Sequence, residues 1–216
     1  MTPDRTAPPK RKAAHTLSLL LLLLVGAAPL SAARAADDAS GFIAGLGSHA
    51  IAIMQDTAIS PAERQRRFRT LMAEDFDLPK IAQFVLGSYW PKTSDSERQQ
   101  FTSTFGDFMA GIYSTRFAEY SAQSFRVTSQ RVESEMTTVV SSEIVRAATG
   151  EELDLDWIVA KTPDSYKVTD ITAGGMSLSR AQRDEFASVV HRNGDNVSNL
   201  IRQMQVRSTD LAAVAP

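Results

Sequence analysis

Cysteine is absent from the 216-residue sequence, so neither a disulfide bond nor a cysteine-linked lipid anchor can form. No second long apolar run follows residues 17–25, and we therefore expect no membrane-spanning helix in the rest of the chain. The three histidines lack metal-ligand spacing, and no phosphate-binding loop of the form GxxxxGK[ST] occurs. These absences argue against a metal site, a nucleotide-hydrolysing site and a bound cofactor.

Basic residues are also scarce once a predicted leader is set aside. The chain carries 23 Lys and Arg against 25 Asp and Glu. Residues 1–36 hold five of the basic residues and one of the acidic ones, so the rest of the chain has a net charge of −6. An acidic chain without a basic cluster is a poor ligand for nucleic acid or for an anionic membrane surface. We therefore expect no nucleic-acid partner.

The first 36 residues have the three parts of a secretory signal peptide. A basic segment at residues 5–12 is followed by the leucine-rich run of residues 17–25 and by an Ala-x-Ala cleavage sequence. The run is short for a transmembrane helix, which needs about 20 apolar residues. We therefore expect export to the bacterial periplasm, with cleavage near Ala35 or Ala36.

No repeat and no long linker rich in proline, glycine or serine divides the remaining chain. With about 180 residues, it is long enough to bury one sizeable core. We therefore expect a single domain over residues 37–205, followed by a flexible tail over residues 206–216.

Helices are predicted in the first half of this domain. Apolar residues at helical spacing predict a helix over residues 40–56. A capping box that begins at Ser60 opens the next helix, and a short third helix runs from Asp77 to Gly87.

The longest predicted helix covers residues 94–120 and begins with a capping box formed by Ser94 and Glu97. Its apolar arc covers roughly half of the circumference, against the roughly 100° that an ordinary surface helix needs. The residues of this arc are Phe101, Phe105, Phe108, Met109, Ile112, Tyr113, Phe117 and Tyr120. Such a wide arc suits either a central core helix or one wall of an apolar cavity.

After residue 120 the apolar period changes from helical to alternating, which predicts strands. Four are expected, around residues 124–127, 136–145, 153–159 and 166–171. Short turns join them, so they should form an antiparallel meander. Helices return over residues 179–193 and 196–205. The sequence therefore predicts an α+β fold in which helices wrap a curved four-stranded antiparallel sheet and enclose an apolar pocket.

Five segments of the chain carry a further signal: residues 84–90 (FVLGSYW), 94–105, 113–120, 155–157 (LDW) and 166–178. Their order and spacing resemble the MlaC (toluene-tolerance) family over residues 40–205. The resemblance implies an NTF2-like, cystatin-like sheet and a periplasmic phospholipid carrier. We expect the protein to be a monomer. The resemblance also implies two partners, namely an outer-membrane lipoprotein complex and an inner-membrane complex of an MCE-domain protein with an ABC transporter. The hopanoid-associated HpnM branch shares these motifs, so a hopanoid or another hydrophobic ligand is an alternative cargo.

The residues that we expect to contact lipid tails come from both halves of the fold. They are Phe105, Met109, Tyr113 and Phe117 of the long helix, Val140, Leu155, Trp157 and Val168 of the sheet, and Tyr89 and Trp90 at the pocket mouth. The alternative for each is ordinary core packing. Arg116 is expected at the pocket rim, where it would meet a lipid phosphate; the alternative is an ion pair with Glu119.

Two other functional classes stay open. Asp170 and Tyr166 share a strand face, and NTF2-like folds also host acid–base enzymes, so a small-molecule isomerase or hydratase is one alternative. A structural adaptor with a filled core is the other. We expect no catalysis, because Asp170 more simply accepts hydrogen bonds from the glycine turn at residues 174–175. Cavity volume separates a carrier from an adaptor, and a raised carboxylate pKa inside the pocket would indicate an enzyme.

Overall fold

The computed structural model describes residues 31–119, 124–145 and 149–214, with the side chains of residues 39–114, 124–145 and 149–211. Four helices and a 3-10 turn come first: α1 (Ser31–Gln55), α2 (Pro61–Asp75), α3 (Leu78–Leu86), η1 (Gly87–Lys92) and α4 (Asp95–Glu119). The strands follow: β1 (Ser124–Ser134), β2 (Thr137–Val145), β3 (Glu152–Lys161), β4 (Tyr166–Ala173) and β5 (Met176–Ser177). Helices α5 (Leu178–Arg192) and α6 (Val197–Val214) complete the chain.

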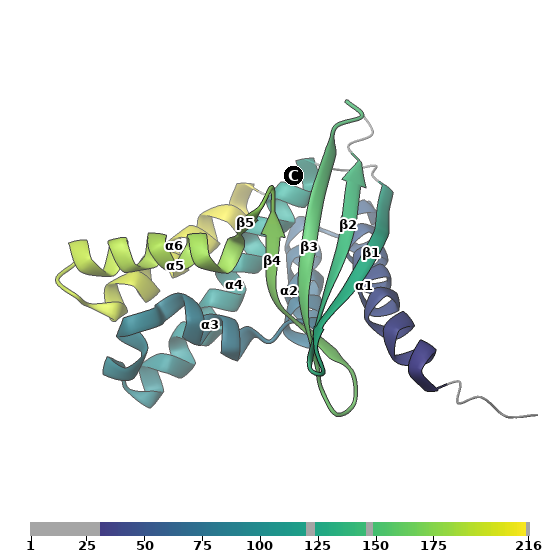
Figure 1. Ribbon diagram of the computed structural model, residues 1–216. Coiled ribbons are helices and arrows are strands. Elements are labelled where there is room, and N and C mark those ends of the chain that lie inside the picture. The colour runs from purple at the N-terminus through teal and green to yellow at the C-terminus, as the bar shows by residue number, and fades with distance from the viewer. Residues whose placement is uncertain (1–30, 120–123, 146–148, 215–216) are drawn as a thin grey trace, which may run out of the picture. The chain divides into compact units, whose positions relative to one another are not determined.

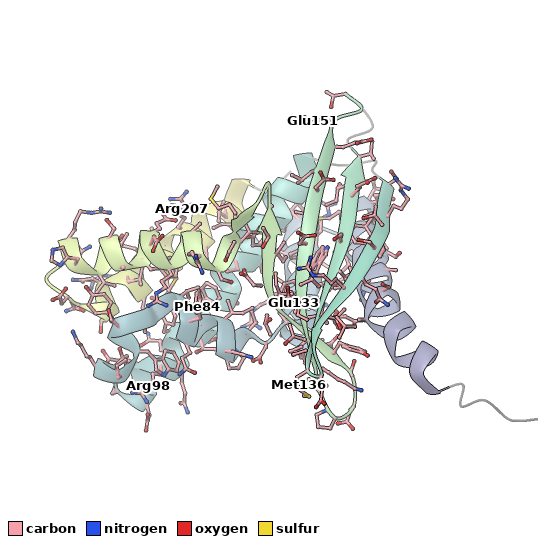
Figure 2. The ribbon with its side chains drawn as sticks, in the orientation of Figure 1. Phe84, Arg98, Glu133, Met136, Glu151 and Arg207 are labelled. Atoms are coloured by element: carbon pink, nitrogen blue, oxygen red, sulfur yellow. The ribbon has the colours of Figure 1, made fainter. Side chains whose placement is uncertain are left out.

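The sheet is an antiparallel meander in the order β1-β2-β3-β4-β5 (Figure 1). Helix α1 lies against β1 and β2, and α4 lies against α2 and α6. Register shifts between β1 and β2 and between β3 and β4 interrupt the ladder, and such bulges bend a sheet. Met136 marks one end of the sheet, at the β1–β2 turn, and Glu151 marks the other (Figure 2). The α+β prediction is confirmed.

The number of strands and the end of the last helix differ from the prediction. The sheet has a fifth strand. The sequence does not predict it, because a strand of two residues is too short to show an alternating pattern. Helix α6 continues to Val214, nine residues beyond the predicted end at Gln205. Leu211, within this extension, lies 3.3 Å from the position that a Cβ would take at Gly111 of α4. The additional turns of α6 therefore pack against α4. The predicted signal peptide falls largely on residues 1–30, outside the described residues, and stays a prediction.

Two helix starts follow the capping boxes read from the sequence. Ser94 Oγ accepts from the Glu97 N–H at 3.3 Å, and a Glu97 carboxylate oxygen accepts from the Ser94 N–H at 3.2 Å. Ser60 likewise accepts from the Glu63 N–H at 3.2 Å. Hydrogen bonds from Arg66 and Arg67 lower the pKa of Glu63 to about 2, so part of the basic face of α2 is neutralised by its own first turn.

The start of α5 differs from the prediction, which placed the cap at Ser179. The hydroxyl of Ser177 caps this helix instead, accepting from the Arg180 N–H at 3.1 Å. The Ser179 N–H is bound elsewhere, because it donates to a carboxylate oxygen of Asp170 at 3.1 Å. Asp170 also accepts from the Ser177 hydroxyl at 2.5 Å and from the Ile171 N–H at 2.9 Å. It therefore ties β4 to α5, rather than accepting from the glycine turn as predicted.

The aromatic arc of α4 is buried and divides into two parts. Phe101 and Phe105 stack at 6.0 Å between ring centroids, and Phe186 of α5 meets both rings edge-on. Phe108 also contacts Phe186. Helix α5 therefore fills the space beside the first part of the arc, while the part that contains Met109 is available to line a cavity. In the described part of the chain, no helix has the combination of length and apolarity needed to cross a membrane.

Two of the three glycines in helix α1 have contrasting surroundings. A Cβ at Gly47 would clash with ring carbons of Phe125, whereas a Cβ at Gly45 would meet nothing within 4 Å. Because glycine in a helix interior is about 1 kcal/mol less favourable than alanine, we expect Gly45→Ala to raise the free energy of unfolding by up to that amount. Gly47→Ala should lower it, since the Phe125 ring must move. Urea denaturation of the two variants measures both effects, and equal shifts would contradict the expectation.

Candidate functional site

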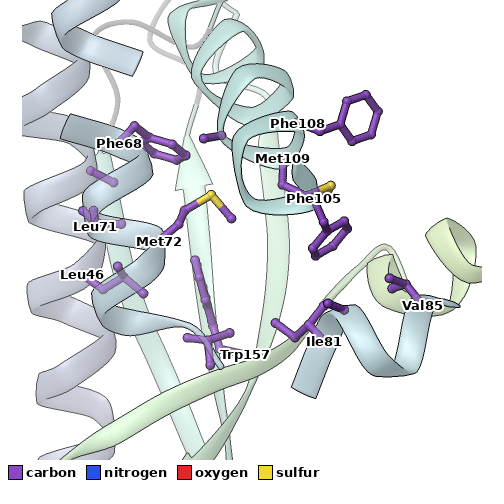
Figure 3. Packing of buried hydrophobic residues seen from close by; sticks show 14 of the residues in the cluster. Leu46, Phe68, Leu71, Met72, Ile81, Val85, Phe105, Phe108, Met109 and Trp157 are labelled. Carbon is purple, nitrogen blue, oxygen red and sulfur yellow. The ribbon is translucent and has the colours of Figure 1, made fainter. Parts of the chain in front are cut away.

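A cavity of about 200 Å³ lies between the sheet and helices α1, α2 and α4. Its wall includes Leu46 of α1, Leu71 and Met72 of α2, and Trp157 of β3 (Figure 3). Ala50 of α1 and Leu155 of β3 also line it. Among the described residues, no side chain that lines this cavity carries a charged group. We call it the first cavity.

The alternation of β3 explains why the sheet side of this cavity is apolar. Leu155, Trp157 and Val159 point toward the helices and are buried, whereas Asp154 and Asp156 on the other face are exposed. The indole N–H of Trp157 donates to Ser142 Oγ at 2.8 Å, so the one polar atom of this side chain is satisfied. The ring of Phe125 meets the indole edge-on at 6.0 Å between centroids. These contacts fix the orientation of Trp157 in the wall.

A second cavity of about 40 Å³ lies among α3, α4, β4 and the start of α5. Ile81 and Val85 of α3 form one side of it, and Phe105 and Met109 of α4 form another. Asp170 borders it, but its two oxygens already accept the three hydrogen bonds described above. This arrangement supports a structural role for Asp170.

The structure brings five of the predicted tail contacts to the two cavities. Leu155 and Trp157 line the first cavity, Phe105 and Met109 line the second, and Tyr113 lines both. Phe117 and Arg116 belong to α4, but their side chains lie outside the described residues.

The other four predicted contacts lie elsewhere. Val140 and Val168 are fully buried and belong to the lining of neither cavity. Tyr89 and Trp90 lie in η1 and also line neither cavity. The hydroxyl of Tyr89 donates to a carboxylate oxygen of Asp195 at 2.8 Å, and the guanidinium carbon of Arg98 lies 5.4 Å from the centroid of Trp90.

Sequence reasoning missed the residues of α1, α2, β1 and β2 that line the first cavity. Ala50 and Met72 line it from the helices, and Phe125 and Ile144 line it from β1 and β2. Their apolar spacing identified a buried face but gave no sign that the space in front of it is empty. In the described part of the chain, no group of three or more His, Cys, Asp or Glu is placed to hold a metal ion.

An antiparallel sheet and a helical layer that enclose an uncharged apolar cavity define a binding domain suited to a hydrophobic ligand. The family profile described as "MlaC protein" matches residues 47–206, well over half of the chain. The chain therefore belongs to the MlaC family.

The chain is also similar to a curated relative and to a solved structure. The chain is 24% identical over 144 residues to the intermembrane phospholipid transport system binding protein MlaC of Haemophilus influenzae. The match covers 63% of this chain and 66% of that protein, just under two thirds of its length. The fold also matches a phospholipid-binding protein from Ralstonia solanacearum, solved in complex with a phospholipid, with a TM-score of 0.69 and 23% identity. That match covers 81% of this chain and 99% of the other, and it supports the fold.

Proposed function

We propose that this protein is a periplasmic phospholipid carrier, exported by a signal peptide over residues 1–36. The observation that carries the proposal is the uncharged apolar cavity between the sheet and the helices of a member of the MlaC family. The names of the relatives give further support, because one is named for intermembrane phospholipid transport and the other holds a phospholipid.

The size of the first cavity indicates that its walls separate when lipid binds. An engineered cavity of about 150 Å³ holds benzene, so about 200 Å³ accommodates only a short segment of an acyl chain. A two-chain lipid has about 30 methylenes, whose burial is worth on the order of 20 kcal/mol. Leaving a bilayer costs a similar free energy. The transfer of lipid from a bilayer to such a carrier therefore has a net free energy near zero.

A transfer with a net free energy near zero has no preferred direction. An energised partner must therefore supply the direction of transport. From the resemblance to the MlaC family, we propose that the protein shuttles lipid between an outer-membrane lipoprotein complex and an inner-membrane complex of an MCE-domain protein with an ABC transporter. Tyr113, Leu155 and Trp157 are the proposed tail contacts with the firmest geometric support, since all three line the first cavity. Arg116 lies one helical turn beyond Tyr113 on α4 and is the proposed partner of the lipid phosphate.

Mass spectrometry of an organic extract of the purified mature protein tests the proposed function. We expect diacyl phospholipid in near-stoichiometric amount. The apolar lining of the cavity suits acyl chains, and it has no charged group with which to bind a polar ligand. A hopanoid in the extract would replace phospholipid as the cargo. Protein that carries no lipid, and takes none up from phospholipid vesicles after delipidation, would refute the carrier.

A further inference from the structure

A polar groove of about 530 Å³ lies at the junction of helices α2, α4 and α6. Helix α4 contributes Thr104, Asp107 and Ala110 to its lining. Because α4 lies against both α2 and α6, these residues form the floor of the groove, and the other two helices form its walls. None of the described residues that line the groove also lines either cavity. The groove is therefore a separate site, and its volume lies within the roughly 300–1,000 Å³ of small-molecule sites.

The floor of the groove carries a hydroxyl group without a partner. Thr104 is 6% exposed, and its side chain forms no hydrogen bond among the described residues. Its oxygen is not sealed from solvent, since the groove opens beside it. Thr102 of the same helix differs, because its hydroxyl donates to the Arg98 carbonyl at 2.8 Å. Polar side chains buried to this extent normally have a hydrogen-bond partner, so the hydroxyl of Thr104 is available to a ligand.

The charged groups that line the groove are already paired. Arg66 donates to the two carboxylate oxygens of Glu63 at 2.7 and 2.6 Å. Arg69 of the α2 wall forms an ion pair with Asp107 of the floor. Each guanidinium is thus neutralised by a neighbouring carboxylate, and the carboxylate of Asp107 repels an anion that approaches the floor. The groove therefore favours a ligand without net charge.

The other polar groups of the groove can donate and accept hydrogen bonds. Gln65 and Gln205 carry amides on the two walls, and an amide offers both donors and an acceptor. The hydroxyls of Ser208 and Thr209 donate to carbonyls of α6 at 2.8 and 3.1 Å, so their oxygens remain acceptors. Each hydroxyl group of a ligand likewise donates and accepts. This arrangement therefore suits a ligand that carries several hydroxyl groups.

We propose that the groove binds a neutral sugar. The hydroxyl groups of the sugar pair with the Thr104 hydroxyl on the floor and with the amides of Gln65 and Gln205 on the walls. An N-acetyl group adds to the fit, because its methyl can lie on Ala62 or Ala110 and its amide can pair with a glutamine. Among the described residues, no aromatic ring lines the groove, so binding rests on a few hydrogen bonds. We expect a dissociation constant on the order of 1 mM.

Titration of the mature protein with diacetylchitobiose, a neutral sugar of two N-acetylglucosamine units, tests the proposal. Backbone amide shifts measured by NMR should move around Thr104 and Ser208 and stay unchanged around Leu155 in the first cavity. Inorganic phosphate is the second probe and should move none of the groove signals, because the guanidinium groups are already paired. Shifts with phosphate but not with the sugar, or no shifts at the groove with the sugar, would overturn the proposal. The lipid extract tests the carrier separately.

A matched pair of variants tests the role of the unpaired hydroxyl. Thr104→Val removes the hydroxyl and keeps the shape of the side chain, so the protein should fold and bind the sugar about two- to tenfold more weakly, the effect of one hydrogen bond. Thr102→Val removes a hydroxyl outside the groove lining and should keep the wild-type affinity. Gln205→Ala, at an exposed position on the α6 wall, should also weaken binding. Wild-type affinity in folded Thr104→Val, or in Gln205→Ala, would overturn the proposal.

Discussion

Replacing Ala50 with phenylalanine is expected to remove lipid from the protein and to leave the empty protein at least as stable as the wild type. Ala50 lines the first cavity from α1 and is 7% exposed. Since benzene fits a cavity of about 150 Å³, the added ring fits one of about 200 Å³. Cavity-filling substitutions commonly add about 0.5–2 kcal/mol to the free energy of unfolding. The same ring occupies space that an acyl chain needs.

Val140→Phe is the matched control for this variant. Val140 is fully buried and lies outside the lining of both cavities, so a ring there has no space to enter. Overpacking of this kind lowers the free energy of unfolding by about 1–3 kcal/mol. Urea denaturation of delipidated protein, beside the amount of lipid recovered per chain, measures both variants. Equal destabilisation by the two, or wild-type lipid content in Ala50→Phe, would show that the first cavity holds no lipid.

The contrast between Val140 and Ile144 shows where sequence reasoning stops. Both residues lie on the inner face of β2 and both are buried, so the alternating pattern predicts the same environment for them. Only Ile144 lines the first cavity. The difference depends on how the helices pack against the sheet, and that is a property of packing between distant segments. Periodicity identifies which side chains are buried but not whether the space before them is filled.

The same reason explains the division of the α4 arc. The sequence predicts one apolar face that contains Phe101 and Phe105 and continues to Tyr113. Phe186, which lies far away in the sequence, fills the space beside Phe101 and part of that beside Phe105. The space beside Tyr113 stays open to both cavities. The long helix and its buried face were thus predictable, whereas the position of the cavity along that face was not.

Local signals failed where a distant residue decided the outcome. Ser177 and Ser179 are both acceptable helix caps, and the hydrogen bond from the Ser179 N–H to Asp170 leaves the capping role to Ser177. Tyr89 follows a helix end, a position that predicts a residue at a pocket mouth, but its hydroxyl donates a hydrogen bond to Asp195. In each case the deciding partner lies on another element.

Trp157→Ala is expected to produce the largest loss of stability among these variants. Trp157 is 5% exposed, and truncation of a buried tryptophan lowers the free energy of unfolding by about 3–5 kcal/mol. It also leaves the hydroxyl of Ser142, 1% exposed, without the indole N–H that it accepts from at 2.8 Å. The vacated space adds to the first cavity, because the indole forms part of its wall.

This enlargement gives a result that a core tryptophan would not give. A ligand that binds only the folded protein stabilises it in proportion to the logarithm of its concentration over its dissociation constant. Acyl methylenes that enter the vacated space lower that constant, so phospholipid should restore more stability to Trp157→Ala than it adds to the wild type. Trp157→Phe keeps a ring in the wall and removes the indole donor, so it should cost less, about 1–3 kcal/mol, and leave the lipid effect near the wild-type value. Urea denaturation with and without a short-chain phosphatidylcholine distinguishes the two. If lipid stabilises both variants equally, Trp157 belongs to a filled core and does not border the lipid.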